Sequence, residues 1–164
     1  MNLSPNPAPH IRHIQTTRGV MGDAVTALSF LYAMAVYFYG PRALWLCFVS
    51  VGVCFGCDVL CDLANKRRHN LRDFSSVVTG MMIPLMLPAS VPYPIVITAG
   101  VFGIIVAKHP FGGVGHNIFN PAAAGFSFAA ICFDKALFTY PPPNQALPVF
   151  GAIEFSTVHY SETP

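Results

Sequence analysis

The sequence predicts an all-α integral membrane protein with about five transmembrane or half-membrane helices and a glycine-rich re-entrant loop. Composition is the first reason, because 54% of the 164 residues are hydrophobic and 10% are charged, against about 25% charged in soluble domains. Apolar runs separated by short polar segments are the second reason. The third is a glycine-rich segment, residues 111–122, between two of these runs. Irregular backbone at membrane depth occurs only where protein, water or a ligand satisfies it.

Five apolar runs define the expected helices in chain order. The first two reach the roughly 20 residues that a helix needs to cross the hydrocarbon. The other three hold 12 to 14 residues each and are interrupted or flanked by proline and glycine. Short, broken apolar segments are typical of discontinuous helices around a binding site. The runs cover residues 20–39, 43–63, 74–87, 95–107 and 122–133.

We expect three parts: a cytoplasmic N-terminal segment (1–19), a transmembrane helical domain (20–133) and a truncated external tail (134–164). The first segment lacks the apolar core and cleavage site of a signal peptide, so the first span is expected to act as its own signal. If the loops alternate between two sides, seven basic residues fall on one side and two on the other. The positive-inside rule then predicts a cytoplasmic N-terminus and a multi-pass protein of the cell inner (plasma) membrane. The seven are Arg12, Arg18, Lys66, Arg67, Arg68, Arg72 and Lys108, and the two are Arg42 and Lys135.

Residues 111–122 hold the candidate cofactor site. Glycines allow positive φ and close backbone approach, and an asparagine followed by proline is typical of a helix start. The first amides of that helix would face the loop and could hold a carboxylate, a phosphate or an electron-rich ring edge. The alternative is a tight turn between two spans, with glycines present only for packing. The candidate binding residues are Gly112, Gly113, Gly115, His116, Asn117 and Asn120.

Few ionisable residues fall within or beside the predicted spans. Asp58 and Asp62 share one helix face just before the basic residues 66–68, which predicts interfacial ion pairs with those bases. A cation or proton relay is the alternative role of the two carboxylates. His109 follows Lys108 at a predicted membrane boundary and is expected to be an interfacial charge.

Other clusters of reactive or polar residues are expected to pack. Cys54, Cys57 and Cys61 share one helix face, but sulfurs spread over roughly 10 Å along one helix are poor ligands for a compact metal site. We therefore expect apolar packing and no metal. Residues 75–80 form a small, hydroxyl-rich face that favours helix packing over ligand contact. The sequence holds no nucleophile triad, phosphate-binding loop or dinucleotide fingerprint, and we assign no catalytic residue.

One string within the loop is specific enough to indicate a family. From Gly112 the sequence reads glycine-glycine-x-glycine-x-asparagine-x-phenylalanine-asparagine-proline-alanine, after an apolar run that ends in Lys108. With Ser4-Pro5, residues 10–21 and residues 78–80, this string resembles the RnfD/NqrB family. That family comprises membrane subunits of the Rnf and sodium-pumping NADH:quinone oxidoreductase complexes, and the likeness is closer to RnfD, from the Rnf ion-translocating electron transport complex.

The resemblance implies a membrane flavoprotein subunit of an Rnf-type complex. Such a subunit relays electrons between ferredoxin and NAD, coupled to sodium or proton translocation, so the enzyme would be an ion-translocating ferredoxin:NAD oxidoreductase. The implied cofactor is FMN, joined by a phosphoester to a threonine on the external side, with riboflavin as another candidate. The implied partners are the other Rnf complex membrane subunits and the lipid bilayer, and no nucleic acid. Family members are longer, and the chain resembles their N-terminal half.

Thr163 is the candidate FMN anchor. The attachment motif of the family resembles serine-glycine-alanine-threonine, whereas residues 161–164 read Ser-Glu-Thr-Pro. Glu162 therefore stands where alanine is expected. A carboxylate beside the acceptor hydroxyl repels a phosphate that carries about one to two negative charges. We therefore expect little or no covalent FMN on this chain.

Two other functional interpretations stay open at the level of sequence. A channel or secondary transporter subunit for a small solute or cation is favoured by the short broken helices alone. The chain could also be a non-functional half-subunit. Bound flavin would distinguish the flavoprotein subunit of an Rnf-type complex from both of these alternatives.

Overall fold

The chain folds into a bundle of helices. The structure, a computed structural model, describes residues 16–65, 74–111, 117–138, 140–141 and 147–150. These ranges contain helices and no strand. The elements are α1 (Thr17–Tyr39), α2 (Arg42–Ala64), α3 (Ser75–Met86), α4 (Tyr93–Phe102), the π-helical turn η1 (Gly103–Lys108), α5 (Pro121–Cys132) and α6 (Asp134–Leu137).

The five predicted apolar runs coincide with five helical stretches. Helices α1 and α2, of 23 residues each, are long and apolar enough to cross a membrane. The shorter apolar stretches are α3, α4 with η1, and α5. These findings agree with the predicted all-α membrane class. The number of crossings and the re-entrant loop stay predictions, since residues 112–116 lie outside the described residues.

Local chemistry accounts for the helix boundaries near α1. Thr16 begins α1, because its side-chain oxygen accepts a hydrogen bond from the amide of Gly19 at 3.3 Å, which satisfies an otherwise unpaired first-turn donor. Gly40 ends the helix with a φ of 74°, a conformation that glycine adopts without the Cβ penalty. The two longest helices are thus joined by a tight turn.

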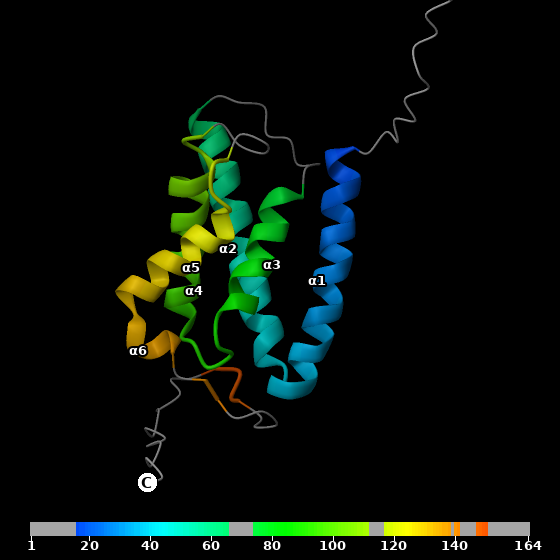
Figure 1. Ribbon diagram of the computed structural model, residues 1–164, viewed down its shortest axis with the longest axis vertical. Coiled ribbons are helices and arrows are strands. Elements are labelled where there is room, and N and C mark those ends of the chain that lie inside the picture. Colours follow the sequence, from blue (N-terminus) through cyan, green and yellow to red (C-terminus); the bar gives the residue numbers. More distant parts are fainter. Residues whose placement is uncertain (1–15, 66–73, 112–116, 139, 142–146, 151–164) are drawn as a thin grey trace, which may run out of the picture.

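Helix α2 lies at the centre of the bundle. In Figure 1, α1 stands at one edge and α4 with α5 at the other, while α2 and α3 lie between them. The α2–α3 contact is close, because a Cβ added to Gly80 would lie 2.6 Å from the Cα atom of Val51. For Gly80, this confirms the packing role predicted for the small residues of 75–80.

Helix α1 contributes little to the core. Tyr32 is its buried residue, and its hydroxyl donates to the carbonyl of Met81 on α3 at 2.8 Å. Large apolar side chains on the outer faces are exposed, including Phe30 on α1 and Phe48 on α2. Exposed aromatic and aliphatic faces of this kind are costly in water and suited to lipid or to other helices.

At the end of the bundle where α2 begins, Arg42 joins three segments. The side chain is 1% exposed, and its Nε, Nη2 and Nη1 groups donate to the carbonyls of Ala89, Val91 and Pro148 at 2.9, 3.2 and 2.6 Å. Tyr93 adds a cation–π contact to Arg42. Residues 147–150 therefore pack against the bundle, and α6 gives the start of the expected tail a helical turn that its sequence did not indicate.

Candidate functional site

A groove runs along the outer face of α5 next to the start of that helix. Its volume is about 430 Å³, within the range of small-molecule sites. The lining comes from the end of α4, the segment before α5, and α5 itself. The lining residues are Phe102, Phe119, Asn120, Ala123, Ala124, Ser127, Phe128 and Ile131, and none is charged.

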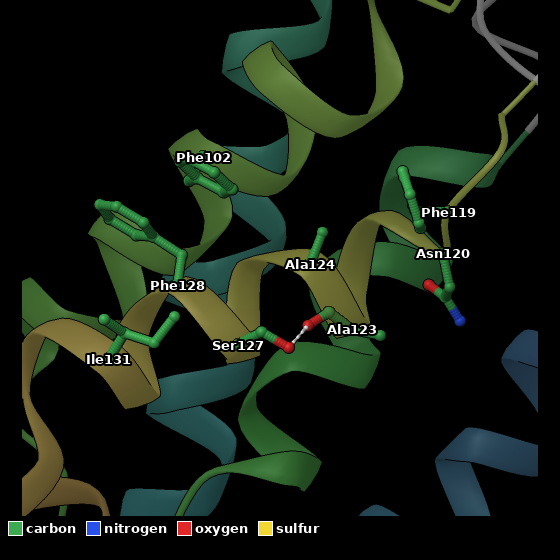
Figure 2. A pocket seen from close by; sticks show the side chains of 8 residues that line it. All are labelled: Phe102, Phe119, Asn120, Ala123, Ala124, Ser127, Phe128 and Ile131. Carbon is green, nitrogen blue, oxygen red and sulfur yellow. Dashed lines mark hydrogen bonds between the residues drawn. The ribbon is translucent and has the colours of Figure 1, made fainter.

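Aromatic rings lie at both ends of this groove. Figure 2 shows the rings of Phe102 and Phe128 together at one end, and Phe119 with Asn120 at the other. The first two rings stack face to face, with centroids 4.1 Å apart and an interplanar angle of 3°. A flat, uncharged aromatic ligand would find apolar walls and a ring stack to extend.

Two polar side chains contribute to the groove. Ser127 donates its hydroxyl hydrogen to the carbonyl of Ala123 at 2.9 Å, which leaves its oxygen lone pairs as acceptors. Asn120 is exposed, and its side-chain amide can donate as well as accept. The groove can therefore offer a donor and an acceptor to the polar edge of a ring.

Asn120 also begins α5, as predicted. Its side-chain oxygen accepts from the amide of Ala122 at 3.0 Å, and its backbone carbonyl accepts from the amide of Ala124. Pro121 has no amide hydrogen. Most amide donors in the first turn of α5 are thus already hydrogen-bonded. Fewer amides remain to bind an anion than the sequence predicted.

The two ends of the glycine-rich segment lie close together. The rings of Phe111 and Phe119, on either side of residues 112–116, are in edge contact with centroids 6.4 Å apart. Of the predicted binding residues, the structure describes Asn117, which is half-buried and does not line the groove, and Asn120. Gly112, Gly113, Gly115, His116 and Thr163 lie outside the described residues.

A separate, polar site lies where η1 meets α2 and α3. Asp58 Oδ1 lies 2.8 Å from Lys108 Nζ and 2.9 Å from His109 Nε2, while the Ser76 hydroxyl donates to Asp58 Oδ2. Asp58 was expected to pair with residues 66–68, which lie outside the described residues. Within the described chain, Asp58 contacts Lys108, His109 and Ser76, and its pairing with residues 66–68 stays a prediction.

The π-helical turn brings these groups to α2. In η1 the amide of His109 bonds to the carbonyl of Ile104, five residues back, at 3.1 Å. Such turns insert a residue into a helix and are frequent at functional sites. Gly103, the first residue of η1, allows the turn to lie close to α5, because an added Cβ would lie 2.6 Å from the carbonyl oxygen of Pro121. The turn joins Phe102 in the groove to Lys108 in the ion pair.

For Cys54 and Cys57 the predicted apolar packing is confirmed. Cys54 is fully buried in the core, and Cys57 packs against that core. Among the described residues, no group of three or more histidine, cysteine, aspartate or glutamate side chains could hold a metal ion.

Sequence reasoning missed Phe102, Phe128 and Lys108 as site residues. The phenylalanines belong to runs rich in apolar residues, so nothing local distinguishes them from lipid-facing side chains. Lys108 was counted only as a loop charge. A lysine at the end of an apolar run, with two carboxylates in another run, was the one signal that could have suggested a buried pair.

Comparison with known proteins gives one family. The family model described as the NQR2, RnfD, RnfE family matches residues 5–161. A relative from Acetobacterium woodii, the D-type subunit of its Na(+)-translocating ferredoxin:NAD(+) oxidoreductase complex, is 34% identical over 128 residues, or 78% of this chain and 40% of the relative. The D-type subunit of the ion-translocating oxidoreductase complex of a Vibrio cholerae serotype O1 strain is 32% identical over 138 residues, or 83% and 40%.

An archaeal relative extends the comparison. The D-type subunit of the ion-translocating oxidoreductase complex of Methanosarcina acetivorans is 27% identical over 128 residues, covering 78% of this chain and 44% of the relative. The chain therefore spans less than half the length of these curated relatives.

Proposed function

Because this chain belongs to the NQR2, RnfD, RnfE family, we propose that it is a membrane flavoprotein subunit that relays electrons within an ion-translocating oxidoreductase complex. The finer proposal is an Rnf-type translocase, with electrons passing between ferredoxin and NAD and coupled to sodium or proton movement. The names of the relatives from Acetobacterium and Vibrio support this assignment. The observation that carries the flavin part is the aromatic groove beside Asn120.

The chemistry of the groove fits the ring system of a flavin better than a phosphate. An isoalloxazine ring is flat and aromatic, with carbonyl oxygens and one N–H group on its polar edge. The Phe102–Phe128 pair supplies a stacking surface, while the described residues of the lining include no lysine or arginine that would bind a phosphate. A non-covalent flavin held by its ring, such as riboflavin, is therefore the ligand that we propose here.

The residues of the chain would bind and orient that ring. Asn120 can donate to a ring carbonyl through its side-chain nitrogen, while its oxygen keeps the helix cap. Ser127 can accept from the ring N–H, and the two phenylalanines exclude water from one face. When bound, a flavin supplies one- or two-electron transfer. The chain itself sets the ring's position and its apolar surroundings, both of which tune such a cofactor.

We further propose a plasma-membrane location with the N-terminus in the cytoplasm, and contacts with other membrane subunits of the complex. The two 23-residue apolar helices support membrane insertion. Exposed apolar side chains such as Ile131, at 84% exposure, support further protein or lipid contacts on the groove side. A neighbouring protein of the complex would also close the shallow outer side of the groove.

Flavin retention tests this function. The full chain, purified in lipid nanodiscs with riboflavin or FMN present, should retain flavin that denaturation releases, with less retained by Phe128→Ala. Phe30→Ala, on the exposed face of α1, is the matched control and should retain as much as the wild type. No flavin on the wild type, or equal flavin on both variants, would contradict the proposal.

The channel or transporter interpretation keeps one supporting observation, the buried charged pair of Asp58 and Lys108. Ionisable groups inside membrane helices are often part of ion paths in transporters. Cation uptake into vesicles by a flavin-free chain would favour it.

A further inference from the structure

Three polar side chains, each from a different element, form a buried cluster in the bundle. Asp58 on α2, Ser76 on α3 and Lys108 at the end of η1 are 8%, 5% and 4% exposed. The Lys108 ammonium lies 2.8 Å from both Asp58 Oδ1 and Ser76 Oγ. Ser76 donates its own hydrogen to Asp58 Oδ2. Each of the three side chains therefore contacts the other two.

The directions of these hydrogen bonds decide which kind of ligand this cluster can bind. Because the Ser76 hydrogen is used on Asp58, the hydroxyl lone pairs face Lys108. The ammonium nitrogen thus lies where a carboxylate oxygen and a hydroxyl oxygen converge. Hard oxygen ligands of this kind are those that alkali and alkaline-earth cations prefer. The Lys108 ammonium is thus held by oxygen atoms of the kind that also bind such cations.

A second carboxylate lies one helical turn away. Asp62 follows Asp58 by four residues on α2, and His109 lies between them, with Nε2 at 2.9 Å from Asp58 Oδ1 and Nδ1 at 4.0 Å from Asp62 Oδ1. Asp62 is nearer the end of α2 and about 6 Å from Asp58 along the axis. A displaced Lys108 side chain, being long and flexible, would have an alternative acceptor there.

Stability alone is a weak reason for this arrangement. Burying two charges costs desolvation energy, and their mutual attraction often does no more than offset that cost. A protein with an apolar pair of similar volume in their place is therefore commonly as stable. Ionisable groups inside membrane helices are accordingly associated with ion paths.

We propose that Asp58 and Ser76 form a binding site for a monovalent alkali cation, with sodium as the probe, and that Lys108 is its built-in competitor. Either the ammonium or the cation neutralises Asp58, and Asp62 receives the ammonium when the cation enters. The cation site stands on this geometry alone. Its use in ion translocation rests on the proposed function.

The competition predicts opposite effects of removing the two charges. Lys108→Gln vacates the position while an amide can still donate to Asp58, so sodium should bind more tightly. Asp58→Asn removes the charge that binds any cation. Lys135→Gln, at an exposed residue of α6, removes one positive charge elsewhere and is the matched control.

Thermal unfolding of the full chain in nanodiscs measures this binding, since a ligand that binds the folded state raises the melting temperature with its concentration. Sodium chloride is titrated against choline chloride at constant ionic strength. We expect the half-saturating sodium concentration of Lys108→Gln to be at least tenfold below that of the wild type. Asp58→Asn should show no sodium-specific shift, and Lys135→Gln should match the wild type.

A folding defect would also be informative. If Lys108→Gln unfolds in choline, sodium should restore it, and failure of sodium to do so would overturn the proposal. The double variant Asp58→Asn/Lys108→Gln should fold without any response to sodium. Equal sodium responses in the wild type and Lys108→Gln, or a response that survives Asp58→Asn, would also overturn it. Flavin content, measured on the same samples, reports separately on the proposed function.

Discussion

Gly125 on α5 lies directly against the carbonyl oxygen of Ala99 on α4: a Cβ added to Gly125 would be 2.4 Å from that oxygen. Four residues further along the chain, at the start of η1, Gly103 approaches Pro121 in the same way. The two backbones thus touch without side chains between them. This contact fixes how α5 crosses α4, and with it the stacking of Phe102 on Phe128 at one end of the groove.

Gly125→Ala should therefore separate the helices and destabilise the fold. Overpacking costs about 1–3 kcal/mol where neighbours can shift, and a backbone carbonyl shifts less readily than a side chain. Gly52→Ala is the control, because nothing lies within 4 Å of an added Cβ there and alanine favours a helix by about 0.5–1 kcal/mol. Unfolding midpoints in detergent should fall for the first variant and hold or rise for the second. A fall in both would show that the contact is not specific.

Arg42→Lys should destabilise the chain although it keeps the charge. A lysine cannot reproduce the planar donor fork that reaches Ala89, Val91 and Pro148. Leaving these carbonyls short of donors should cost about 2–4 kcal/mol. Arg18→Lys, at an exposed residue over the Phe74 ring, should change stability by less than about 1 kcal/mol. Chemical denaturation in detergent compares the free energies of unfolding of the two variants. Similar losses of stability would contradict a special role for the three Arg42 hydrogen bonds.

Asn120 has two roles that substitution can separate. Asn120→Leu removes the cap on Ala122 and should lower stability by about 0.5–2 kcal/mol. It should also weaken flavin binding. Asn120→Asp keeps the accepting oxygen but removes the amide donor, so stability should hold while flavin affinity falls. Flavin fluorescence titration and thermal unfolding on the same samples distinguish the roles. Unchanged flavin binding in both variants would restore the interpretation of a plain turn.

The predicted topology can be tested with reporters. A reporter inserted within residues 66–72 should be cytoplasmic and one fused after Pro164 external, because the basic residues are divided seven to two. An alkaline phosphatase fusion, active outside, and a green fluorescent protein fusion, fluorescent inside, report the side. The same side for both positions would rule out five crossings.

Covalent FMN should be scarce on this chain. Glu162 beside Thr163 repels the incoming flavin phosphate, so Glu162→Ala should increase attachment when the flavin transferase is supplied. In-gel flavin fluorescence after denaturation measures it, with Thr163→Ala as the negative control. Strong signal in the wild type, lost in Thr163→Ala, would show that the repulsion does not matter. Signal that survives Thr163→Ala would move the anchor, with Thr157 the next candidate.

The helices could be predicted from the sequence because apolar length and proline are local properties. The Asn120 cap, too, was visible in the Asn-Pro pair and was confirmed. The π-helical turn and the close approach of Gly103 to the backbone of Pro121 were not visible, because the contact between these two segments is made by tertiary packing.

Pairings between helices were beyond sequence reasoning for the same reason. Asp58 and Lys108 are far apart in the chain, and the rotation of each helix about its axis decides whether they meet. The groove likewise needs α4 and α5 at their observed crossing before Phe102 and Phe128 stack. Nearby charges at residues 66–68 offered a simpler local pairing, which is why Lys108 was overlooked as the partner.

Photolabelling of the full chain with an azido-flavin tests the central claim most directly. The purified protein in nanodiscs is illuminated with azido-riboflavin, digested, and its labelled peptides are identified by mass spectrometry, with and without excess riboflavin. We predict labels on peptides that contain Phe102 or residues 119–131, removed by the competitor and reduced in Phe128→Ala. Labels spread over α1 and α2, or labels that excess riboflavin does not remove, would contradict a flavin site in the α4–α5 groove.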